Sequence, residues 1–113
     1  MNINVEYRKG IIFLRPKGYL TKETYKKLEN KINRIVDYGE FTNIVLNLSR
    51  LTRLDLKGIS SLFYTYDIIK KYKGQIYVCI NNEKIKEKLK KHRLLNYVEE
   101  IESELDAFKL IRI

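Results

Sequence analysis

The sequence predicts a single α/β domain spanning residues 1–113, with a mixed sheet of four or five strands, an N-terminal β-hairpin and helices mainly on one face. Two apolar segments separated by Lys9-Gly10 indicate the hairpin. Beyond them, strand-like and helix-like segments alternate, and parallel strand neighbours require such crossover connections. The length of 113 residues fits one domain, and the hydrophobic fraction of 44% is enough for a core.

The first part of the chain contains the hairpin and one helix. Residues 2–8 alternate between apolar and polar side chains, as a half-buried strand does, and 11–15 form its partner. We expect Pro16 and Gly18 to end this second strand, and Thr21 to cap a helix. The apolar residues that recur at helical spacing are Tyr25, Leu28, Ile32, Ile35 and Val36.

The middle of the chain predicts two more strands around a second helix. Residues 44–48 and 75–80 are apolar runs of strand length, and 49–54 is expected to be a connector. Asp55 is a typical N-cap for the helix that follows. The apolar stripe of that helix is Ile59, Leu62, Phe63, Tyr66 and Ile69.

The last part predicts two helices and a short strand. Asn81 or Asn82 caps a helix that continues to about Lys91, residues 98–101 are a candidate last strand, and Ser103 starts a final helix. The residues of this final helix expected to face inward are Leu105, Phe108 and Leu110.

The net charge of +9 raises nucleic acid or an anionic surface as a partner, through the lysines at 70–73 and 84–91. These lysines are spread over separate segments, and the chain is also rich in Ile, Asn and Tyr, a bias that an AT-rich coding sequence produces by itself. Nucleic acid is therefore the alternative partner. Because no secretory signal and no apolar stretch of about 20 residues is present, we expect a cytoplasmic protein without a membrane span.

The sequence offers little for catalysis or for holding a metal. His92 is the single histidine and Cys79 the single cysteine, so metal sites that need several such ligands are not expected. We interpret Cys79 as a core residue and His92 as a helix-end residue. The chain has no nucleophile elbow and no phosphate-binding loop. We therefore predict a protein that is not an enzyme and has no cofactor.

The most informative segment starts with Asn47-Leu48-Ser49 after a buried strand and continues to Asp55-Leu56-Lys57-Gly58-Ile59. It resembles the STAS domain family, and within it the bacterial anti-sigma factor antagonists, whose pattern is D-L-S followed by D-S-S-G. Gly18-Tyr19-Leu20-Thr21 stands where the family has G-E-L-D. Further matches are Lys73 to Val78, at the family's fourth strand, and Leu94-Leu95 before its last strand.

The resemblance implies a domain that works by partner switching. In this family the unphosphorylated domain binds an anti-sigma factor, often a serine kinase, and phosphorylation of the second serine of D-S-S-G ends the binding. That serine lies at a helix N-terminus, which tolerates a phosphate. Here the position is Lys57, which cannot be phosphorylated in this way, and the preceding serine is Leu56. The resemblance thus implies constitutive binding or a partner with an acidic face.

The resemblance and the helix pattern together give a set of candidate partner-binding residues. Ser60 and Ser61 are the remaining candidates for phosphorylation, with ordinary helix positions as the alternative. Helix capping and packing alone are the alternative for Asp55 and Gly58. A STAS subunit of a larger signalling or lipid-transport assembly is a further possibility. The candidates for partner binding are Tyr19, Thr21, Asp55, Lys57, Gly58, Ser61 and Tyr64.

Overall fold

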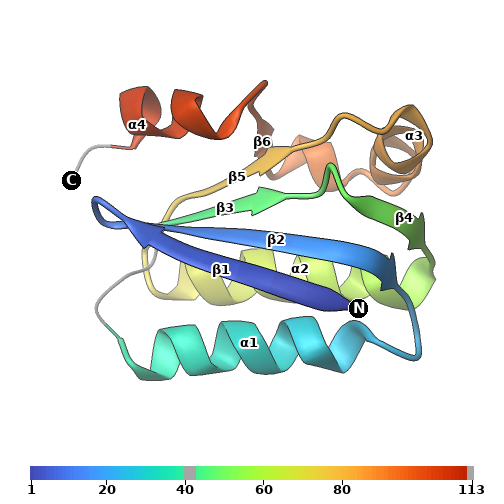
Figure 1. Cartoon of the computed structure of the whole chain (residues 1–113), viewed down its shortest axis with the longest axis horizontal. Helices are drawn as coiled ribbons and strands as arrows, with labels where there is room; N and C mark the ends of the chain where they lie inside the picture. The colour runs from blue at the N-terminus through green and yellow to red at the C-terminus, as the bar shows by residue number, and fades with distance from the viewer. Residues whose placement is uncertain (40–42, 112–113) are drawn as a thin grey trace.

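The computed structural model describes residues 1–39 and 43–111, which form one mixed sheet with helices packed against it (Figure 1). The strands are β1 (Asn2–Arg8), β2 (Ile11–Leu20), β3 (Ile44–Asn47), β4 (Leu51–Leu54), β5 (Ile76–Cys79) and β6 (Glu99–Glu100). The helices are α1 (Tyr25–Asp37), α2 (Leu56–Lys71), α3 (Glu83–Lys91) and α4 (Ala107–Leu110), with 3₁₀ turns η1 (Leu94–Asn96) and η2 (Glu104–Asp106).

The sheet has the order β1-β2-β3-β5-β6, with β4 beside the far end of β2. β1 and β2 form the antiparallel hairpin, and every other pairing is parallel. The mixed sheet and the hairpin confirm the predicted fold class. The described sheet has six strands, because the expected connector contains β4 and the candidate last strand is the two-residue β6.

The prediction that Pro16 and Gly18 end the second strand was wrong, because β2 continues through both. The Ile12 amide donates to the Asn43 carbonyl of the β3 side (2.9 Å), and the Gly18 amide donates to the Arg50 carbonyl of the β4 side (3.1 Å). Residues 12, 16 and 18 are an even number of positions apart, so the backbone nitrogen of Pro16 faces the same side of β2 as the Ile12 and Gly18 amides. Pro16 falls between these two hydrogen bonds, where β2 leaves β3 and meets β4. Its missing N–H therefore removes no ladder hydrogen bond, which is the usual obstacle to proline inside a sheet.

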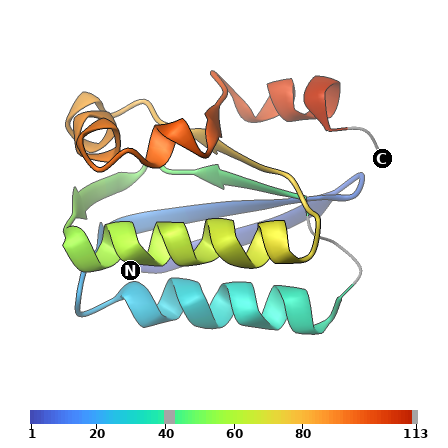
Figure 2. The same ribbon diagram turned by 180° about the vertical axis from the view of Figure 1, so that it is seen from behind.

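The main core lies between the sheet and the long helices α1 and α2, which run side by side along one face (Figure 2). α1 buries Leu28, Ile32 and Val36, as its periodicity predicted. Its start is later than expected. Thr21 accepts at its carbonyl the amides of Thr24 (3.0 Å) and Tyr25 (2.8 Å), so a turn precedes the helix. α3 and η1 extend the same core at one end through Ile85, Leu89 and Leu94.

The opposite face of the sheet is covered in part by η2 and α4 (Figure 1). Phe108 packs on Phe13 with ring centroids 5.6 Å apart, beside the buried Cys79. The prediction that Leu105 and Leu110 face inward was wrong, since they are 67% and 43% exposed. A single 3₁₀ turn followed by a four-residue helix is too short to repeat an apolar stripe toward the sheet.

Candidate functional site

The segment that the sequence singled out forms the start of α2, and Asp55 organises it. The Asp55 carboxylate accepts the amide of Gly58 (2.8 Å), as an N-cap does, and also the amide of Lys22 (2.9 Å). Burial opposes ionisation of this carboxyl, but the backbone N–H groups of Gly58, Lys22 and Lys57 outweigh it and lower its pKa. Asp55 is thus an ionised cap that also joins the turn before α1 to the start of α2.

Gly58 is required by packing at the same helix start. A Cβ atom on Gly58 would lie 2.1 Å from the carbonyl oxygen of Leu20 and 2.9 Å from Cδ1 of Leu54. No side chain fits there unless the backbone of β2 moves. The glycine therefore lets the first turn of α2 contact the ends of β2 and β4 directly.

Around this buried support lies an exposed patch that we call the α2 surface, made of Tyr19, Lys22, Arg53, Leu56 and Lys57. Tyr19 is 51% exposed and Leu56 is 66% exposed. The Arg53 guanidinium lies over the Tyr19 ring, 5.2 Å from its centroid. The Lys57 ammonium lies 4.8 Å from the centroid of the Tyr25 ring at the start of α1. The α2 surface thus combines apolar area with cations held over aromatic rings.

The structure separates the seven candidate residues. Tyr19 and Lys57 are exposed members of the α2 surface, Asp55 is the half-buried cap that supports it, and Thr21 and Gly58 are buried. Ser61 is fully buried, and its hydroxyl donates to the Gly58 carbonyl (2.7 Å). Tyr64 is half-buried and its hydroxyl donates to Asn33 of α1, whereas Ser60 is exposed.

Three residues of the α2 surface were missed by the sequence reasoning. Arg53 lay in a segment expected to be a connector, for which no side-chain direction could be predicted. Lys22 is placed by the turn that precedes α1, and that turn was expected to be helix. Leu56 was noted only as the replacement of a family serine, although an apolar residue next to a helix cap could have signalled an exposed position.

The two lysine-rich segments lie at opposite ends of the molecule. α2 begins near α3 and finishes at the other end, so its C-terminal Lys70 and Lys71 are far from the lysines of α3 (Figure 2). Two lysines of α3 are also engaged, since the Lys88 ammonium donates to the Leu54 carbonyl (2.7 Å) and Lys86 pairs with Glu100 (3.1 Å). The segments therefore do not form one continuous basic surface of the kind that a nucleic acid would follow.

Other chemistry has little support in the part of the chain that the structure describes. Residues 1–39 and 43–111 contain no cluster of three or more His, Cys, Asp or Glu side chains that could hold a metal ion. Burial raises the pKa of the Cys79 thiol to about 12, which makes it a poor nucleophile at neutral pH. Among the described helices, none has the length and apolar character needed to cross a membrane.

A comparison with family models identifies the family of this chain, and superpositions on solved structures show its fold. The family model of the STAS domain matches residues 2–107. A Thermotoga maritima protein described as a candidate anti-sigma factor antagonist superposes with a TM-score of 0.90 at 18% identity, over 98% of this chain and 95% of that one. An anti-sigma factor antagonist from Mycobacterium paratuberculosis gives 0.87 at 21% identity, over 99% of this chain and 94% of that one. Unphosphorylated SpoIIAA, the Bacillus anti-sigma factor antagonist, gives 0.75 at 15% identity, over 96% of each chain.

Proposed function

The chain belongs to the STAS domain family, and from that membership we propose that it is a regulatory protein-binding module that acts as an anti-sigma factor antagonist. Its partner is an anti-sigma factor or a related regulatory serine kinase, bound at the α2 surface. Support for this role comes from structural neighbours that are themselves anti-sigma factor antagonists.

The observation that carries the proposal is the exposure of Leu56 beside a rigid, capped helix start. Its side chain is 66% exposed, while Ile59 and Leu62, further along α2, are buried in the core. Tyr19 adds a second exposed apolar group, and tyrosine is frequent among the residues that dominate interface energetics. An apolar centre surrounded by charged side chains is the usual anatomy of a protein interface.

The charges around Leu56 indicate the chemistry of the partner. The ionised Asp55 carboxylate offsets one of the three cations of the α2 surface, Lys22, Arg53 and Lys57, so positive charge remains in excess there. Glu23 is a nearby exposed acid. We propose that the partner presents an acidic patch, because complementary potentials steer association and exclude wrong partners.

The substitution of Lys57 changes how such a module is controlled. A lysine holds a positive charge where the family resemblance places a phosphoserine, and it cannot be converted into a phosphate ester. We propose that binding is constitutive with respect to this position. Of the two serines that follow, Ser60 has an exposed side chain and Ser61 does not, so Ser60 is the accessible site for any relocated switch.

Co-purification of the tagged chain from its native cells tests the binding role. We expect the unchanged chain to retain an anti-sigma factor or regulatory kinase, identified by mass spectrometry. Leu56→Asp and Lys57→Glu should each weaken the purified complex at least about tenfold in calorimetry, or about 1.4 kcal/mol. Lys70→Glu, which makes the same charge change at the far end of α2, is the matched control and should bind normally. Equal binding by the unchanged chain and the three variants would contradict the proposal that the partner binds at the α2 surface.

Two further measurements separate the alternatives. Bound nucleic acid, if it is the partner, should dissociate steeply as salt is raised, because phosphate contacts release counterions. An interface with an apolar centre should lose less affinity. Incubation with the co-purified kinase and ATP should leave the mass of the protein unchanged. Stoichiometric phosphorylation of Ser60 or Ser61 would overturn constitutive binding and place the switch one turn along α2.

A further inference from the structure

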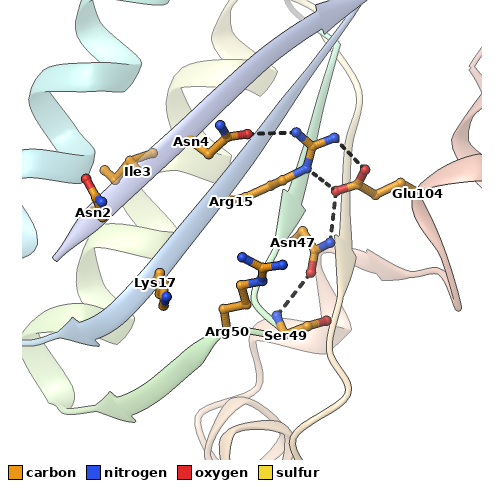
Figure 3. Close-up of a pocket in the computed structure, with 9 residues that line it drawn as sticks. All are labelled: Asn2, Ile3, Asn4, Arg15, Lys17, Asn47, Ser49, Arg50 and Glu104. Atoms are coloured by element: carbon orange, nitrogen blue, oxygen red, sulfur yellow. Dashed lines mark hydrogen bonds and ion pairs between the residues drawn. The ribbon is translucent and has the colours of Figure 1, made fainter.

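The sheet face that carries η2 and α4 has an open cavity of about 690 Å³, to which η2 contributes Glu104 (Figure 3). Its size falls within the range of roughly 300–1,000 Å³ that is typical of small-molecule sites. Its wall comes from β1, β2, the turn after β3, and η2, and its side chains are almost all polar. They are Asn2, Ile3, Asn4, Arg15, Lys17, Asn47, Ser49, Arg50 and Glu104.

One side of the cavity is occupied by a closed network around Arg15. The Arg15 guanidinium donates to both carboxylate oxygens of Glu104 (2.7 Å each), to Asn4 (2.7 Å), and pairs with Glu6 (2.8 Å). The Asn47 amide also donates to Glu104 (2.8 Å). These contacts raise the pKa of Arg15 and lower that of Glu104. Both groups are therefore charged and engaged with each other.

The other side of the cavity has cations without partners. Among the residues that the structure describes, neither Lys17 nor Arg50 forms an ion pair or a side-chain hydrogen bond. Figure 3 shows the Arg50 guanidinium reaching from its turn into the space between Lys17 and Asn47. Ser49 lies beside them, and its hydroxyl is buried without a hydrogen-bond partner in the described part of the chain. Figure 3 draws this hydroxyl pointing away from the Arg50 guanidinium, so it does not belong with the two free cations.

The net charge of the cavity is positive, which favours binding of an anion. Arg15 and Glu104 neutralise each other, while Arg8 lies 3.6 Å from Glu6 and offsets that carboxylate. Lys17 and Arg50 then remain as uncompensated positive charges. Within a cavity, such charges interact more strongly than on a flat surface in water.

We propose that this cavity binds a phosphate group, either inorganic phosphate or the phosphate of a small organic molecule. Arg50 donates to two phosphate oxygens with its planar guanidinium, and Lys17 adds a second cation. Asn2 and Asn4 line the remaining space, where their side-chain amide N–H groups bind polar groups of the organic part. This site does not depend on the proposed partner, because it uses none of the residues of the α2 surface.

The test is an NMR titration of the ¹⁵N-labelled full chain with inorganic phosphate, with the ionic strength held constant by sodium chloride. We expect saturable shifts at the amides of Lys17, Ser49 and Arg50. The double variant Lys17→Gln/Arg50→Gln should weaken phosphate binding at least tenfold, whereas the control Lys70→Gln/Lys90→Gln, with the same change in charge, should not. Linear shifts without saturation, or equal affinity in the two double variants, would overturn the proposal.

A second arm of the titration distinguishes the two sources of the phosphate. Glycerol 3-phosphate replaces inorganic phosphate under the same conditions. Tighter binding of glycerol 3-phosphate, with added shifts at Asn2 and Asn4, indicates a small phosphorylated molecule as the ligand. Equal binding indicates that the phosphate group alone is recognised. In both cases the shifts at Lys17 and Arg50 must disappear in the double variant that lacks these cations.

Discussion

The two faces of the sheet are closed by different kinds of contact. Against α1, α2 and α3, the described residues form one cluster of 21 buried apolar side chains. Against η2 and α4, the cluster has seven buried apolar side chains, and the Arg15–Glu104 ion pair lies beyond its edge. The first face buries most of the apolar area, which is the dominant favourable term in folding. The second face leaves polar space open.

This difference separates stability from function within one small domain. The packed face positions the start of α2 through contacts that tolerate almost no change, so that the exposed α2 surface has a fixed shape. The partly covered face holds its C-terminal segment with a small apolar cluster and the Arg15–Glu104 ion pair, and it keeps a cavity beside that pair. We therefore expect substitutions on the two faces to differ in size, in pH dependence and in their effect on binding.

The largest effect is expected for Gly58→Ala, on the packed face. The added methyl group would lie 2.1 Å from the Leu20 carbonyl oxygen, so α2 must shift away from β2. We expect a loss of about 3 kcal/mol in the free energy of unfolding, as for severe overpacking. Urea denaturation measures it. Ser60→Ala, at an exposed position of the same helix, is the control and should change stability by less than about 0.5 kcal/mol. Equal stability of both variants would show that α2 adjusts freely.

A smaller effect is expected for Glu104→Gln, on the partly covered face. The substitution removes a charge-assisted pair whose side chains are 25% and 23% exposed, so we expect a loss of about 1–2 kcal/mol at neutral pH. Because the hydrogen bonds from Arg15 lower the pKa of Glu104, its contribution is present above the unfolded pKa of about 4.3. It is lost as the pH falls through the lower folded pKa.

Urea denaturation between about pH 2 and 7 measures this contribution as the difference between the two proteins. The stability curves of the unchanged chain and Glu104→Gln should converge at acidic pH and separate at neutral pH. Asp55, whose pKa is also lowered, is present in both proteins and cancels in the difference. Glu102→Gln, at an exposed neighbouring position, is the control. A constant difference at all pH values would mean that ionisation of Glu104 does not stabilise α4.

The smallest effect is expected for Lys57→Ala, which lies outside both cores. Its ammonium over the Tyr25 ring is an exposed cation–π contact, so we expect a change below about 1 kcal/mol in unfolding free energy. Urea denaturation at neutral pH checks this. A small change shows that the Lys57 variants used for partner binding are folded. A loss as large as that of Gly58→Ala would place Lys57 in the structural support.

Much of the fold could be predicted from periodicity and from caps. The stripe of Leu28, Ile32 and Val36 predicted the buried side of α1, and Asp55 was predicted as the cap of α2, because both signals are local in sequence. The family resemblance at Asp55 to Ile59 directed attention to the start of α2, where we propose that the partner binds. These features depend on spacing along the chain, which the sequence displays directly.

Features that depend on neighbouring elements were decided only by the tertiary structure. Pro16 continues β2 because its position falls in the gap between β3 and β4, and no local pattern indicates that gap. Ser61 is buried although it adjoins exposed Ser60, since α2 packs on two sides. Arg15 and Glu104 meet across 89 positions of the chain, and their pairing leaves Lys17 and Arg50 as unpaired cations of the cavity. Such long-range geometry is set by how the elements pack together, which is why the sequence predicted the segment of the α2 surface but not the cavity.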